Sequence, residues 1–170
     1  MIELLSPAGS MDSLRAAVQN GADAVNLGYG QFNARRNAKN FSVEELQEAI
    51  SYCHVRGVQV HLTLNILVSD REMPRAAETI RVAASLGVDA FIVQDLGVVQ
   101  LCHQIAPSVP IHASTQMCIH SLEGVLQAAE LGCTRAVLAR ELPSSAAWST
   151  PSKEWMLIWV EAWMGTLGAI

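Results

Sequence analysis

Short apolar runs alternate with longer amphipathic stretches along the first 141 residues of the chain. The apolar runs are rich in β-branched residues and predict six strands. The stretches between them place apolar residues three or four positions apart, which predicts five helices. The predicted strands are residues 3–5, 24–27, 59–64, 90–93, 110–113 and 136–139, and the predicted helices are 10–20, 42–56, 70–86, 96–105 and 121–131.

One local order of elements recurs along the chain: a helix end, a glycine, a short turn and a buried strand. It occurs at residues 20–25, 86–91 and 131–136, and such repetition is typical of the βα units of a parallel sheet. Ser42 and Glu45 have the spacing of a capping box, and Ser10 and Asp70 are predicted N-caps.

Polar or flexible residues follow each of the six predicted strands. In a (β/α) barrel the carboxyl ends of all strands converge on one mouth, whereas a doubly wound sheet has its site at one switch point. The pattern therefore favours an α/β fold, an incomplete (β/α)8 barrel of the TIM type, with a doubly wound sheet as the alternative. A complete barrel needs about 250 residues, so these units make only part of one.

The end of the chain has a different character. All four tryptophans lie between residues 148 and 163, and serine and proline are frequent just before them. We expect two regions: a partial barrel at 1–142, and a Trp-rich tail at 143–170 that reads as frameshifted or truncated sequence. Cover for the open barrel edge is favoured over a membrane anchor for this tail, because only Lys153 supplies a nearby basic group. The unpaired sheet edge leaves self-association open.

Composition narrows the functional classes. The 170 residues are 51% hydrophobic and 16% charged, with a formal net charge of −5, which suits a packed core and disfavours a surface that coats nucleic acid. The sequence has neither an export signal at its start nor an apolar run of about 18 residues, so a cytoplasmic protein without a membrane partner is expected. The four cysteines form no CxxC pair and are predicted to be buried free thiols, with no metal site.

Seven motifs occur in one order: 3–9, 20–28, 32–41, 63–65, 92–97, 111–117 and 137–142. Together they resemble the N-terminal barrel of peptidase family U32, the collagenase-like protease group, over residues 2–142. The resemblance implies a hydrolase acting on peptides. Other branches of the family are linked to hydroxylation of tRNA, ribosomal RNA or ubiquinone precursors and look like iron–sulfur enzymes. Because no cysteine follows Leu142, we expect no such cofactor in this chain, and a catalytically inactive fragment is a further alternative.

The candidate site lies at the carboxyl ends of the predicted strands. Arg35 belongs to the one concentrated basic patch, and a guanidinium there can hold a carboxylate or phosphate of a peptide or RNA. A serine triad of Ser114, His112 and Asp95 is disfavoured because no nucleophile elbow surrounds the serine, and Asp95 is predicted to cap a helix. No catalytic residue is assigned. The predicted substrate-binding residues are Arg35, Asn37, Asn65, Gln94, His112, Ser114, Thr115, Gln116 and Arg140.

Overall fold

The computed structural model describes residues 3–34 and 40–141 and the backbone of residues 156–157. The described strands form one sheet in which every neighbouring pair is parallel and the spatial order follows the sequence. The strands are β1 (Leu5–Pro7), β2 (Ala24–Leu27), β3 (Gln59–Leu64), β4 (Ala90–Val93), β5 (Ile111–Ala113), β6 (Arg135–Val137) and β7 (Met156–Leu157).

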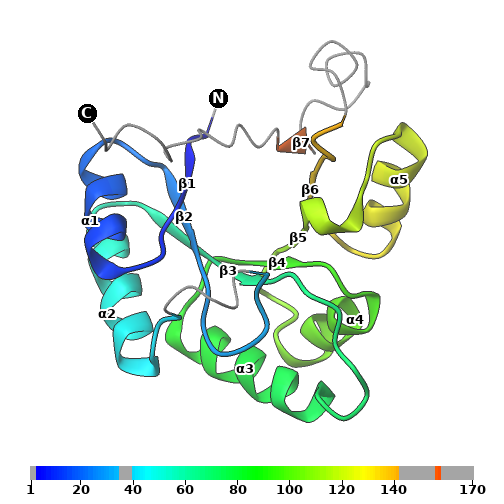
Figure 1. Ribbon diagram of the computed structural model, residues 1–170, viewed down its shortest axis with the longest axis horizontal. Helices are drawn as coiled ribbons and strands as arrows, with labels where there is room; N and C mark the ends of the chain where they lie inside the picture. The colour runs from blue at the N-terminus through cyan, green and yellow to red at the C-terminus, as the bar shows by residue number, and fades with distance from the viewer. Residues whose placement is uncertain (1–2, 35–39, 142–155, 158–170) are drawn as a thin grey trace, which may run out of the picture.

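Helices connect successive strands and lie around the outside of the curved sheet (Figure 1). This arrangement confirms the incomplete barrel and excludes the doubly wound alternative, which needs helices on both faces. In the described part, the helices are α1 (Met11–Gln19), α2 (Val43–His54), α3 (Met73–Leu86), α4 (Leu96–Ile105) and α5 (Leu122–Glu130), with a 3₁₀ turn at Thr115–Met117. None of these helices is long and apolar enough to cross a membrane.

The structure adds a strand that the sequence pattern did not predict. β7 contributes two residues, paired in parallel with β6, from within the region interpreted as a tail. Two residues are too few to show a period of two, so the pattern could not reveal it. The rest of that region lies outside the described residues.

Helix starts follow the capping chemistry with one exception. Ser10 and Ser42 each form a capping box, as predicted. The prediction that Asp70 caps the third helix is wrong, because α3 begins at Met73 with Pro74 in its first turn. Proline is favoured there because it lacks an N–H that would go unbonded in any case.

The bounds of β1, β5 and β6 also differ from the prediction by one or two residues, and hydrogen bonds account for the later start of β1 and the earlier end of β6. β1 begins at Leu5, where pairing with β2 starts, because the preceding Leu4 N–H donates to the Asp23 carboxylate at 2.7 Å. β6 ends at Val137, because the Ala139 N–H donates to the Ile119 carbonyl rather than to a strand. Local hydrogen bonds therefore shift both boundaries by two residues.

Successive side chains along each strand point to opposite faces of the sheet. On β3, Val60, Leu62 and Leu64 join the apolar core that includes helix residues such as Leu46 and Ile80. The intervening His61 lies on the other face and is also buried. The sheet thus has an apolar convex face under the helices and a concave face that carries polar side chains.

A bidentate ion pair crosses the concave side of the sheet. Arg135, which starts β6, donates to both carboxylate oxygens of Glu3, just before β1, at 2.9 and 2.6 Å. The hydrogen bonds from Arg135 lower the pKa of Glu3 below its usual value. This pair links the first and sixth strands and so stabilises the curvature of the partial barrel.

Candidate functional site

The loops that follow β2, β3, β4 and β5 meet at one edge of the sheet, here called the mouth. Parallel strands all end at the same side, so the predicted polar residues at these ends are brought to neighbouring positions. Arg35 and Asn37 belong to this set and lie outside the described residues. The remaining candidates divide into groups that hold the loops, groups that are buried, and groups that stay available.

Asn65, directly after β3, holds the loop that follows β2. Its Oδ1 accepts the Ala34 N–H at 2.9 Å. The same loop is closed internally, because the Asn33 amide donates to Asn40 Oδ1 at 2.6 Å and the Asn40 amide donates to the Gly30 carbonyl. Sequence reasoning missed Asn33 and Asn40 as loop-forming residues, although both lie in the motif at 32–41.

Gly28 allows this asparagine cluster to pack against the end of β2. A Cβ at this position would lie 2.3 Å from Nδ2 of Asn33 and 2.9 Å from Oδ1 of Asn40. Its backbone carbonyl accepts the Phe41 N–H at 3.0 Å. The glycine is therefore needed for the close approach of these side chains.

Asp95, after β4, caps α4 as predicted and also holds a second loop. Its Oδ1 accepts the N–H groups of Gly97 and Val98 at 2.8 and 3.1 Å. Its Oδ2 accepts the N–H of Val68, in the loop after β3, at 3.2 Å. Both carboxylate oxygens are therefore occupied by backbone donors.

Ser114 and His112 do not form a catalytic triad in this structure. Ser114 is 2% exposed, and its Oγ accepts the Gln116 N–H at 3.2 Å as the cap of the 3₁₀ turn. His112 packs edge-on against His61, with ring centroids 4.9 Å apart. Since the Asp95 carboxylate accepts backbone N–H groups, the side chains of Ser114, His112 and Asp95 make other contacts than the hydrogen bonds of a triad.

Three candidates keep polar groups available at the mouth. Gln94 and Thr115 are half-buried and Gln116 is exposed. Among the described residues, none of these three side chains has a hydrogen-bond partner. Arg140 follows β6 and is exposed. Two amides and a hydroxyl from the adjacent strands β4 and β5 can therefore donate to and accept from a bound molecule.

Polar atoms also lie unpaired beneath the mouth, on the concave face. Within residues 3–34 and 40–141, the buried atoms Asn26 Nδ2, His61 Nδ1 and His112 Nδ1 have no hydrogen-bond partner. His61 and His112 touch across β4, where the register places Ala90 beside His61 and Ile92 beside His112. Burial lowers the pKa of His61 to about 4 and that of His112 to about 3, so both rings are neutral near pH 7.

The described cysteines do not fit an iron–sulfur cluster. Cys53, Cys102 and Cys133 are buried, and burial raises their pKa values to about 11, 12 and 11. A cluster needs thiolates, and only Cys118 is exposed, so the prediction that all four cysteines are buried is wrong for this residue. No group of three or more His, Cys, Asp or Glu residues in the described ranges is arranged to hold a metal ion. The predicted absence of a cofactor stays a prediction, and no chemical step is assigned to one.

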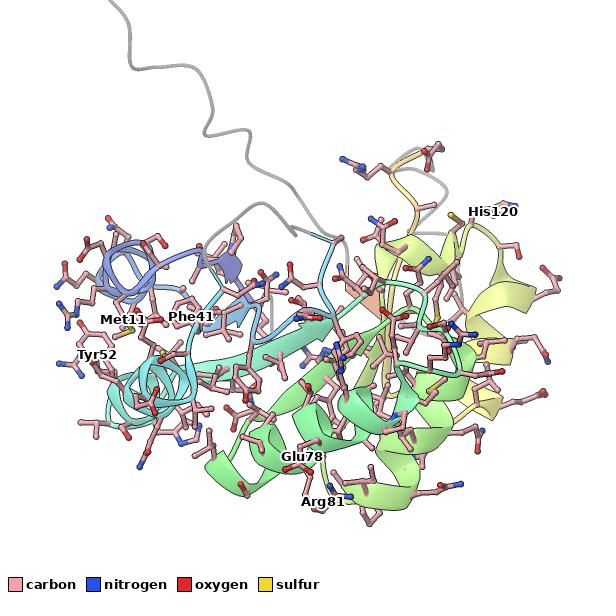
Figure 2. All side chains as sticks on the ribbon, turned by 60° about the horizontal axis from the view of Figure 1, so that its bottom comes forward. Met11, Phe41, Tyr52, Glu78, Arg81 and His120 are labelled. Carbon is pink, nitrogen blue, oxygen red and sulfur yellow. The ribbon has the colours of Figure 1, made fainter. Side chains whose placement is uncertain are left out.

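A small hollow of about 140 Å³ lies beside the mouth, between the loops after β1 and β2. Figure 2 shows two of its lining residues, Met11 and Phe41, side by side, while Glu78 and Arg81 lie on the outer surface of α3. The remaining lining residues are Gly9, Ser10, Asp12, Asn40 and Glu45. None of the described candidate residues lines it, so the hollow does not enlarge the predicted site.

Comparison with known proteins gives relatives with two kinds of name. The chain is 41% identical over 142 residues to tRNA hydroxylation protein P of Helicobacter pylori, covering 83% of this chain and 34% of that protein. It is 40% identical over 141 residues to the 23S rRNA 5-hydroxycytidine C2501 synthase of Escherichia coli, covering 83% and 21%. It is 33% identical over 141 residues to a collagenase of Porphyromonas gingivalis, covering 82% and 33%. The chain thus spans about a third or less of the length of these relatives.

Comparisons with solved structures and with family models identify the family of the chain. A solved U32 peptidase matches with a TM-score of 0.66 at 16% identity, over 81% of this chain and 58% of that chain. That likeness shows the fold alone. The family model described as peptidase family U32 matches residues 9–152. The chain therefore belongs to peptidase family U32.

Proposed function

We propose that this chain is the substrate-binding part of an RNA-hydroxylating member of the family, and that it binds a nucleoside of tRNA or ribosomal RNA at the mouth. The observation that carries the proposal is the set of available polar side chains there: Gln94, Thr115 and Gln116. The names of the tRNA and rRNA relatives support the same substrate class.

Amide side chains suit this task because they donate and accept at once. A nucleobase edge presents donors and acceptors side by side, and glutamine or asparagine can pair with both. RNA-binding proteins read such edges on unpaired, unstacked bases. Because the net charge is −5, the contact with RNA is small and local, and the basic patch that contains Arg35 is its predicted phosphate contact.

Proteolysis is the second candidate function, and the family name and the collagenase relative favour it. A serine mechanism needs a hydroxyl beside a histidine base that a carboxylate orients. Here the Ser114 hydroxyl and the Asp95 carboxylate both accept backbone N–H groups. The geometry therefore supports RNA binding better than serine-based peptide hydrolysis.

A binding experiment separates these two functions. Fluorescence anisotropy is measured with unmodified tRNA and with a gelatin peptide, for the wild type and for Gln94→Ala and Gln116→Ala. Gln100→Ala, which removes an exposed amide from α4, is the matched control. We expect saturable binding of tRNA, weakened about tenfold by each mouth variant and unchanged by the control. Binding of the peptide but not of tRNA would reject the RNA proposal in favour of a peptidase.

Two broader expectations belong to the same proposal. An RNA substrate agrees with a cytoplasmic protein. In the part of the chain that the structure describes, the outer edge of β1 pairs with no strand, and such an edge favours self-association over an isolated partial barrel; Pro7 removes one N–H donor from it. Light scattering after size-exclusion chromatography at several concentrations measures the mass, and a constant monomer mass would contradict self-association.

A further inference from the structure

We infer that Asn65 and Asp95 are positioning residues, which hold two successive mouth loops, and that Gln94 is the amide between them that meets the substrate. The nature of that substrate rests on the proposed function. The positioning role does not, because it concerns contacts within this chain. Asn65 was a substrate-binding candidate from the sequence, so the inference changes its expected role.

The two contacts have the same form, one strand apart. Asn65 at the end of β3 accepts the N–H of Ala34 from the loop after β2. Asp95 at the end of β4 accepts the N–H of Val68 from the loop after β3. In each case a side chain at one strand end fixes the backbone of the preceding loop. Such a bond removes freedom from a loop before a ligand arrives, which lowers the entropic cost of binding.

The side chain of Gln94 has a different environment from those of the two positioning residues, Asn65 and Asp95. It directly precedes Asp95, is half-buried, and makes no side-chain hydrogen bond to the described residues. Its backbone N–H donates to the Leu64 carbonyl at 3.4 Å, which keeps the residue beside the end of β3. The side chain is therefore anchored through its backbone while its amide remains free to bind.

The test pairs hydrogen exchange with tRNA binding on the full chain. Asn65→Ala removes the acceptor. Asn65→Asp keeps an acceptor oxygen but removes the amide donor. Because Asn65→Asp also adds a negative charge that repels RNA, Gln31→Glu, at an exposed position of the loop after β2, is its charge-matched control. Hydrogen exchange at the Ala34 amide, read by NMR, reports the loop directly.

If Asn65 is a positioning residue, Asn65→Ala speeds exchange at Ala34 and weakens tRNA binding about tenfold, whereas Asn65→Asp keeps the protection and binds like Gln31→Glu.

Unchanged exchange at Ala34 in Asn65→Ala overturns the role. So does weak binding by Asn65→Asp with protection intact, because the lost amide would then be a substrate contact. If Asn65→Ala fails to fold, Ala34→Pro removes the donor instead, and unchanged binding by that variant overturns the role. A wild type that does not bind tRNA refutes the proposed function, while exchange at Ala34 still decides the role of Asn65.

Discussion

Acidification is expected to destabilise this protein at an unusually high pH, because two histidines are buried in neutral form. His61 and His112 are 1% and 4% exposed, and the Nδ1 of each has no hydrogen-bond partner in the described part of the chain. Burial is the main cause of their lowered pKa values, about 4 and about 3 against an ordinary 6.5. Their charged neighbours include Arg135, which opposes a second positive charge, and Glu3, whose carboxylate is already paired with that arginine.

Proton linkage sets the direction in which the stability of the fold changes with pH. Below pH 6.5 the unfolded chain protonates both imidazoles, while the folded protein does not until the pH approaches 4, so stability falls as the pH decreases. Each pKa unit corresponds to about 1.36 kcal/mol, which gives ~3 kcal/mol for His61 alone. Since the two rings touch, their effects are not additive. A combined loss of about 5 kcal/mol by pH 4 would remove much of the ~5–15 kcal/mol that stabilises a typical domain.

The assay is urea unfolding at a series of pH values between 7 and 4.5, followed by far-UV circular dichroism. Circular dichroism is chosen over tryptophan fluorescence because all four tryptophans lie at residues 148–163, outside the described residues. His112→Phe keeps an aromatic ring but cannot be protonated, so the loss of stability over this range should roughly halve. His120→Gln, which removes an exposed imidazole, is the control and should leave it unchanged. A wild type equally stable at pH 6.5 and pH 4.5 would refute the reasoning. The Glu3 carboxylate is not the source of a loss in this range, because its pKa is lowered and its contribution to stability is lost only at lower pH.

Two further predictions concern packing and the ion pair. Gly28→Ala should destabilise the fold by about 1–3 kcal/mol in urea unfolding, because the new methyl group collides with the Asn33 amide. Gly9→Ala, where a Cβ meets nothing within 4 Å, is the control, and an equal loss in both variants would contradict the packing argument. Glu3→Gln should cost about 1 kcal/mol after allowance for solvent screening, since the Glu3 and Arg135 side chains are 24% and 30% exposed. High salt should shrink this difference, and a difference independent of salt would show that charge is not its cause.

Much of the fold could be predicted because its signals are local. The bounds of β2, β3, β4 and α4 match the sequence prediction residue for residue. Each of these elements has a strong apolar pattern. The glycine predicted to end α3, Gly87, has the left-handed φ of 93° that such a cap requires. Asp70 failed as a cap because Pro74 favours a later start for that helix, a competition that residue preferences alone do not decide.

The candidate site was less predictable because its contacts join distant parts of the chain. Residue type and position at a strand end suggested Asn65, but neither could indicate that its oxygen would bind Ala34, 31 residues earlier in the chain. Likewise, nothing local to Glu3 indicates a partner 132 residues away. Such pairs depend on strand register and sheet curvature, which arise only when the whole sheet is assembled.

The polarity of the concave face agrees with the proposed site at the mouth. A dry core would fill that face with aliphatic side chains, as the convex face is filled under the helices. Instead it carries Asn26, His61 and His112 with unpaired polar atoms, and a charged pair beside them. Unpaired buried polar groups lower the stability of the fold. Functional sites often contain such locally destabilising groups, and here these groups lie beneath the mouth. The acid titration and the binding experiment therefore examine the same face, the first through its stability and the second through the mouth residues above it.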